Sequence, residues 1–127
     1  MSHPKDELGR WGEAQAAKFL KSRGLRVIAQ NVVLPAGEID LVARDGGTLV
    51  FVEVKTRTEA DYGGPLPAVD GRKRRKLATL ARSYLAAHRL DNAPCRFDVV
   101  GIVQKLLSPE PEIEYIPNAF DAAGRPI

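Results

Sequence analysis

The feature that most constrains the fold is a pair of apolar, β-branched segments joined by Asp45-Gly46-Gly47. The segments run from Glu38 to Arg44 and from Thr48 to Arg57. Each alternates between side chains of different character, which is typical of β-strands. The two glycines can supply the positive φ angles that a tight turn requires. The sequence therefore predicts an antiparallel hairpin between residues 38 and 57.

Charged side chains gather on one face of this predicted hairpin. In the second strand Glu53 and Lys55 follow apolar residues on the same face, and in the first strand Glu38 and Asp40 share a face. A two-residue turn at the glycines sets Asp40 opposite Glu53 and Glu38 opposite Lys55. The four side chains are thus predicted to lie together where the strand leaves the packed interior.

Two opposed carboxylates about 5 Å apart repel each other, which a purely structural sheet normally avoids. A divalent cation between Asp40 and Glu53 would reverse that energy, and oxygen ligands suit Mg²⁺ or Mn²⁺. Lys55 would then hold a water molecule or stabilise charge on a phosphoryl group. The alternative interpretation is structural: Glu38 and Lys55 form a cross-strand ion pair, and the other two acids are solvated at the end of the sheet.

Periodicity predicts the remaining elements. Helical spacing of apolar residues indicates two amphipathic helices, β-branched and alternating runs indicate further strands, and two Gly and two Pro indicate an irregular loop. We expect one domain over residues 1–127, of the α/β class, with a mixed sheet flanked by helices and a loosely ordered tail from about residue 118. The expected elements are helices 6–23 and 71–90, strands 25–33 and 96–103, a short edge strand 113–117, and the loop 61–67.

The second predicted helix opens with an uninterrupted basic run, Arg72, Lys73, Arg74, Arg75 and Lys76. The chain has 19 Lys and Arg against 16 Asp and Glu, a formal charge of +3, so local clustering matters more than the total. The run predicts contact with the phosphates of a nucleic acid. A solvated helix face is the equally weighted alternative. Lys73 and Lys76 continue the apolar stripe of the helix and are expected to point toward the acids.

Other features exclude several classes of protein. Cys95 is the single cysteine, which rules out an internal disulfide and a cysteine-rich zinc site. The first ten residues lack the apolar core of a signal peptide, and no run of eighteen apolar residues occurs. We therefore expect a cytoplasmic protein that has no membrane partner. In the first helix, Glu13 lies near the edge of the apolar stripe and is expected to border a cleft.

Gly37-Glu38-Ile39-Asp40 followed by Phe51-Val52-Glu53-Val54-Lys55 resembles the PD-(D/E)XK nuclease motif, with Ile39 in place of the proline. Together with Gly12-Glu13 and Cys95 to Val100, the chain resembles the YraN-like family from about Leu8 to Phe120. That family is similar to archaeal Holliday-junction resolvases. The resemblance implies a restriction-endonuclease-like fold, a divalent metal and a nucleic-acid substrate, expected to be DNA, with branched DNA among the candidates.

By the same resemblance, Asp40 and Glu53 are metal ligands, Lys55 is the catalytic lysine, and Glu13 is an additional acid near the metal. Glu38 belongs to the family signature and is a further candidate ligand. Resolvase-like relatives also suggest a homodimer. Three hypotheses stay open: a metal-dependent endonuclease, a module that grips nucleic acid without cutting it, and an interaction subunit that works only beside a partner.

Overall fold

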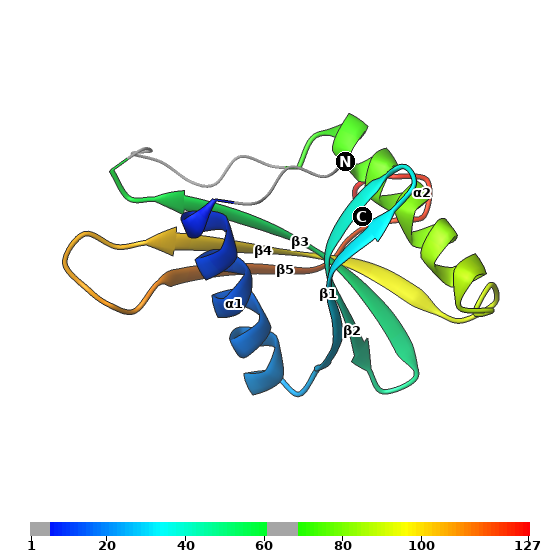
Figure 1. The fold of residues 1–127 in the computed structure, drawn as a ribbon, viewed down its shortest axis with the longest axis horizontal. Coiled ribbons are helices and arrows are strands. Elements are labelled where there is room, and N and C mark those ends of the chain that lie inside the picture. The colour runs from blue at the N-terminus through cyan, green and yellow to red at the C-terminus, as the bar shows by residue number, and fades with distance from the viewer. Residues whose placement is uncertain (1–5, 61–68) are drawn as a thin grey trace.

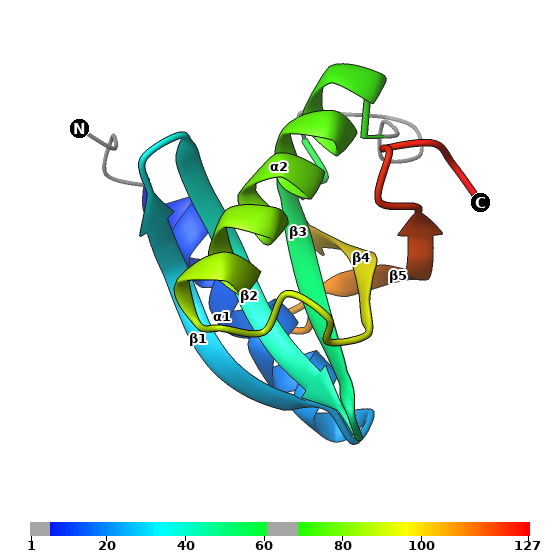
Figure 2. The same cartoon turned by 90° about the vertical axis from the view of Figure 1, so that its right-hand side faces the viewer.

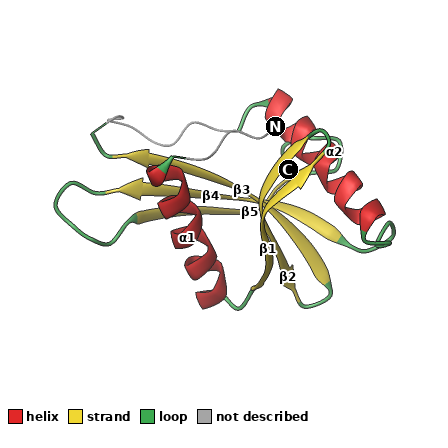
Figure 3. Cartoon of the chain, in the orientation of Figure 1, coloured by secondary structure: helices red, strands yellow, loops and turns green. Residues whose placement is uncertain are grey.

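The computed structural model describes residues 6–60 and 69–127. The predicted loop 61–67 lies outside these residues. Two helices and five strands make up the described part (Figures 1 and 3). In chain order they are α1 (Glu7–Ser22), β1 (Arg26–Leu34), β2 (Gly37–Asp45), β3 (Thr48–Thr58), α2 (Gly71–Ala87), β4 (Cys95–Gln104) and β5 (Glu112–Phe120).

The strands form one mixed sheet in the order β1-β2-β3-β4-β5. The pairs β1–β2, β2–β3 and β4–β5 are antiparallel, whereas β3 and β4 are parallel and are connected through α2. The structure confirms the expected α/β class, with a mixed sheet flanked by helices. β3 lies in the middle of the sheet, so residues on its two faces contact different helices. No helix in the described ranges is long and apolar enough to cross a membrane.

The two helices cover opposite faces of the sheet, as Figure 2 shows with α2 in front of β2 and β3 and α1 behind them. Alternate residues of β3 divide between the two cores. Leu49 and Phe51 pack beneath α2, whereas Val50 and Val52 pack beneath α1. All four side chains are fully buried. By this alternation Glu53 belongs to the α2 face.

Local sequence signals fix the ends of both helices. The side chain of Asp6 accepts the N–H of Gly9 at the start of α1, and that of Asp70 accepts the N–H of Lys73 at the start of α2. α1 ends before Gly24, which has a φ of 90°. In the β2–β3 turn only Gly46 has a positive φ, although a positive φ was expected at both glycines.

The C-terminal region is more ordered than the sequence predicts. The edge strand extends to Phe120 rather than ending at 117, and Phe120 is buried against the α2 core. Beyond it, Asp121 accepts backbone N–H groups of Ala123 and Arg125 in a compact turn. The expectation of a loosely ordered tail from residue 118 is therefore wrong, because one buried aromatic ring and this turn fasten it to the sheet.

A buried carboxylate sets the irregular pairing of β4 with β5. Asp98 is fully buried and accepts hydrogen bonds from the guanidinium of Arg96, the hydroxyl of Tyr115 and the N–H of Asn118. Asn118 has a positive φ, and the register shifts between Phe97 and Val99. Asp98 thus satisfies a main-chain donor that the shifted strand pair leaves over.

Candidate metal centre

The β2–β3 register agrees with the prediction up to the acids. Pairing runs from Asp45–Thr48 to Leu41–Val52, so Asp40 and Glu53 occupy the next position outward. There the side chain of Asp40 replaces the main chain as acceptor: its Oδ2 lies 2.9 Å from the N of Val54. This bond fixes the Asp40 carboxylate beside β3.

The β1–β2 hairpin bends beside Asp40. The register places Asn31 across from Asp40, and Asn31 has a φ of 51°, a left-handed conformation that asparagine tolerates better than most residues. Ile39 and Val42 both pack in the α2 core although they are three residues apart. Side-chain alternation is therefore interrupted around Asp40, and the tip of the hairpin curls toward α2 (Figure 1).

The bend changes the position of Glu38. Glu38 pairs with Val33 of β1, beyond the bend, and the β2–β3 pairs of the described residues stop at Leu41. The prediction that set Glu38 opposite Lys55 assumed a straight hairpin that keeps pairing to the end of both strands, and in the described residues the β2–β3 ladder does not reach them.

Glu53 has the most unusual environment in the hairpin. Its side chain is 8% exposed, and its Oε1 lies 2.9 Å from the Nζ of Lys73 in α2. Burial raises the pKa of Glu53 above its ordinary value, and the negative charge of Asp40 raises it further, while Lys73 and Lys55 act in the opposite direction. Two carboxylates and two ammonium groups thus influence one another across the β3–α2 junction.

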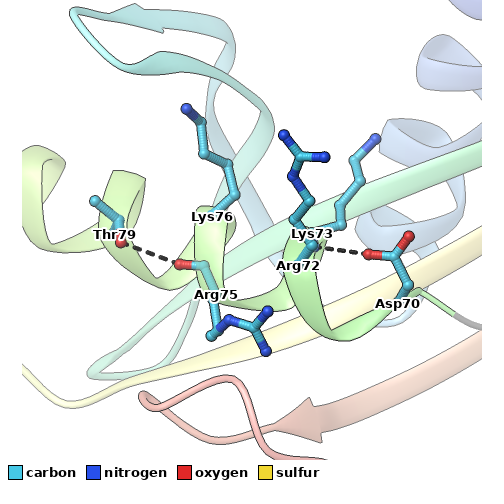
Figure 4. Close-up of a pocket in the computed structure, with 6 residues that line it drawn as sticks. All are labelled: Asp70, Arg72, Lys73, Arg75, Lys76 and Thr79. Atoms are coloured by element: carbon cyan, nitrogen blue, oxygen red, sulfur yellow. Dashed lines mark hydrogen bonds between the residues drawn. The ribbon is translucent and has the colours of Figure 1, made fainter.

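The basic run of α2 divides between two directions. The structure confirms that Lys73 points toward the acids, and Lys76 lies against Gly37 at the tip of the hairpin. Arg74 instead donates hydrogen bonds to the carbonyls of Val69 and Gly124. In Figure 4, Lys73 and Lys76 extend to one side of the helix and Arg75 to the other.

A hollow of about 490 Å³ lies along the start of α2. It opens beside the Lys73–Glu53 ion pair, since Lys73 belongs to both. Cations predominate on its walls, which suits an anionic ligand. Its lining residues, drawn in Figure 4, are Asp70, Arg72, Lys73, Arg75, Lys76 and Thr79.

Glu13 lies in the helix on the opposite face of the sheet. It is 4% exposed, and its neighbour Gly12 packs against Thr56 of β3. Within residues 6–60 and 69–127, no group of three or more His, Cys, Asp or Glu side chains is arranged to hold a metal ion. The carboxylates brought together most clearly are therefore Asp40 and Glu53, and ligand roles for Glu13 and Glu38 stay predictions.

Two contributions to this site were missed in the sequence. Asp70 caps α2, and the positive charges of Lys55 and Lys73 both influence its carboxylate. Hydrogen bonding to Lys73 and these charges lower the pKa of Asp70. Lys73 was expected near the acids but not as the direct partner of Glu53. The signal available in the sequence was that a capping aspartate, Asp70, lies three residues before a lysine, Lys73, in the first turn of the helix.

An ion would find suitable donors here. Asp40 and Glu53 offer carboxylate oxygens, the ligands that Mg²⁺ and Mn²⁺ prefer. The ammonium of Lys73 already stands as a cation against Glu53, and nearby positive charge favours the ionised form of two neighbouring carboxylates. The donor set therefore fits a divalent cation that retains several water ligands.

Comparison with known proteins places the chain in a family. The model of the uncharacterised protein family UPF0102 matches residues 12–102. A UPF0102 protein from Syntrophotalea carbinolica is 42% identical over 124 residues, covering 98% of this chain and 99% of the relative. One from Symbiobacterium thermophilum is 50% identical over 119 residues, covering 91% and 97%. One from Dehalococcoides mccartyi is 44% identical over 120 residues, covering 94% and 98%.

Among solved structures, an EndoMS–dsDNA2 complex matches with a TM-score of 0.40 and 13% identity. The match covers 85% of this chain, which spans 41% of the EndoMS chain. The sequence relatives align over nearly their whole length, and the matched family model spans the hairpin, all of α2, and most of α1 and β4. The chain therefore belongs to the uncharacterised protein family UPF0102, the YraN-like family.

Proposed function

We propose that this protein hydrolyses phosphodiester bonds in nucleic acid with the help of Mg²⁺ or Mn²⁺. The observation that carries the proposal is the buried Glu53 carboxylate, which lies beside Asp40 and faces the ammonium groups of a basic helix start. A structural sheet gains nothing from burying an acid next to another acid. An ion-dependent phosphoryl site requires such a pair.

Each side chain has a defined part in this reaction. Asp40 and Glu53 hold the ion, and the bond from Val54 keeps Asp40 in one orientation. A bound ion supplies Lewis acidity to a phosphoryl oxygen and makes a bound water more acidic. Lys55, half-buried next to Glu53, stabilises the negative charge that grows on the phosphoryl oxygens. Water attacks phosphorus and gives up a proton to the solvent, the bond to the leaving oxygen breaks, and that oxygen takes up a proton from the solvent.

The substrate strand would lie along α2. Arg72, Lys73 and Lys76 line the hollow and can neutralise successive phosphates, which gives binding a strong dependence on salt. Arg74 contributes less to this surface, since its guanidinium is engaged with main-chain carbonyls. DNA is the proposed nucleic acid, with branched DNA as the first substrate to examine.

The test is a cleavage assay with branched, duplex and single-stranded DNA and with RNA, each with Mg²⁺ or Mn²⁺. We expect cleavage of at least one substrate, its loss in EDTA, and its loss in Asp40→Asn and Lys55→Ala. Loss of one general electrostatic group in such sites typically costs about 10²- to 10³-fold in rate. Cleavage that persists unchanged in Lys55→Ala would reject the assignment.

The Lys73–Glu53 ion pair favours a second candidate, a module that binds nucleic acid without cutting it. The pair partly neutralises Glu53 in the protein alone, so the site can be stable without a metal. Salt-sensitive binding of DNA, no cleavage of any substrate and no heat of Mn²⁺ binding would together favour this candidate.

Self-association into a homodimer stays a prediction, which light scattering over a range of concentrations tests.

A further inference from the structure

Lys73 takes part both in the ion pair with Glu53 and in the lining of the hollow along α2. Its Nζ lies 2.9 Å from Oε1 of Glu53, and the same side chain lines the hollow at the start of α2. The Lys73 side chain is 54% exposed whereas that of Glu53 is 8% exposed, so the lysine can reach solvent from its position and the glutamate cannot. A flexible, exposed cation is thus bound to a fixed, buried anion.

Two ligands of opposite charge would compete for the members of this ion pair. A divalent cation between Asp40 and Glu53 needs the Glu53 oxygen that Lys73 now contacts, and it repels the ammonium group. A phosphate in the hollow attracts the same ammonium group, together with Arg72 and Lys76. Each ligand therefore removes an obstacle to the other.

We propose that Lys73 is a positioning residue that couples nucleic-acid binding to metal binding. In the free protein its ammonium group holds Glu53. When a phosphate occupies the hollow, the ammonium group turns to the phosphate and leaves Glu53 to the ion. The inference rests on the proposed function and concerns how that function is regulated: the ion binds weakly until the phosphate backbone of the substrate occupies the hollow. Linkage makes the effect reciprocal, so the metal tightens nucleic-acid binding by the same factor.

Calorimetric titration with Mn²⁺ in the absence of nucleic acid gives the first test. Lys73→Gln removes the competing charge and keeps most of the side-chain stem, so we expect Mn²⁺ affinity to rise at least about fivefold over wild type. Lys73→Arg keeps the charge and should behave as wild type. The matched control is Lys18→Gln, the same loss of charge on the exposed surface of α1, which should leave Mn²⁺ affinity unchanged.

The second test measures coupling directly. Anisotropy of a labelled phosphorothioate DNA duplex, in EDTA and in saturating Mn²⁺, gives the factor by which metal improves DNA binding. We expect this factor to be smaller in Lys73→Gln than in wild type, by at least about fivefold. Thermal melts add a control for a purely structural role, which would lower the melting temperature of Lys73→Gln equally with and without Mn²⁺. Coupling predicts a deficit that is larger without the ion.

The outcomes separate the two proposals. Mn²⁺ binding that is lost in Asp40→Asn but unchanged in Lys73→Gln, with the same coupling factor as wild type, would overturn the role of Lys73 and leave the metal site standing. Absence of Mn²⁺ binding in both wild type and Lys73→Gln would overturn the metal site and the coupling with it. Binding detectable only in Lys73→Gln would support both.

Discussion

The carboxylate of Asp40 accepts the N–H of Val54 at 2.9 Å, so a side chain continues the β2–β3 ladder where the main-chain pairing ends. One oxygen of Asp40 is thereby engaged with β3. The negative charge of the same carboxylate also helps to raise the pKa of Glu53. Asp40 therefore serves both the sheet and the candidate metal centre, and substitutions can separate the two roles.

Asp40→Asn retains an oxygen that can accept the Val54 N–H, whereas Asp40→Ala leaves this donor without its side-chain acceptor. We expect Asp40→Ala to lower the free energy of unfolding by about 1–3 kcal/mol and Asp40→Asn to lower it by much less. Both should abolish Mn²⁺ binding. Urea denaturation and calorimetry measure the two effects, and equal destabilisation by both variants would contradict the role of the hydrogen bond.

Gly12 sets the distance between α1 and β3. A Cβ atom on Gly12 would lie 2.0 Å from Oγ1 and 2.8 Å from Cβ of Thr56. We therefore expect Gly12→Ala to lower the free energy of unfolding by about 1–3 kcal/mol, because the helix or Thr56 must shift. Gly47→Ala is the control, since no atom lies within 4 Å of its added Cβ. Thermal and urea denaturation of both variants decide the matter.

Arg74 and Arg72 are neighbours with different expected effects. Arg74 hydrogen-bonds to Val69 and Gly124, so Arg74→Ala should destabilise the protein by about 1–3 kcal/mol. Arg72 is exposed in the hollow, so Arg72→Ala should leave stability nearly unchanged but weaken DNA binding. The slope of the logarithm of the binding constant against the logarithm of the salt concentration should fall in magnitude by about one. Denaturation combined with binding at several salt concentrations separates the two. A salt slope unchanged in Arg72→Ala would remove Arg72 from the proposed interface.

Tyr115 makes stability depend on alkaline pH. Burial and the hydrogen bond to Asp98 raise its pKa to about 12, above the ordinary value of 10.0. The folded protein thus retains this proton more strongly than the unfolded chain, and the stabilisation is complete below pH 10 and is lost as pH rises through 12. Tyr115→Phe should be less stable than wild type at pH 9, and the difference should shrink toward pH 12. Denaturation across this range tests the sign, and a difference that widens would contradict it.

Much of the fold was predictable because local signals agree with the packing. The glycine turn and the alternation of β3 predicted the β2–β3 register through Leu41 and Val52, and the predicted starts of both helices agree with the structure to within one residue. The bend at Asn31 was not predicted, since asparagine adopts the left-handed conformation only where tertiary contacts favour it. The end of the β2–β3 ladder at Leu41 was not predicted either, because a straight hairpin was assumed.

The sequence predicted which residues make up the candidate site better than it predicted which of them contact one another. Alternation alone brought Asp40, Glu53 and Lys55 together as candidates. The Lys73–Glu53 ion pair depends on how α2 is docked, which follows from packing between residues far apart in the sequence. The same reason hid the ordered C-terminus: Phe120 is buried by contacts with β4 that local composition does not reveal.

Asn31, which has a left-handed backbone conformation, divides the β1–β2 hairpin into two parts with different surroundings. Residues 41–43 of β2 are buried in the hydrophobic interior, while the turn at residues 35–37 overhangs the basic helix, where Gly37 meets Lys76 and Leu80. Changes of length or charge in the overhang would thus alter the entrance to the candidate site and spare the interior.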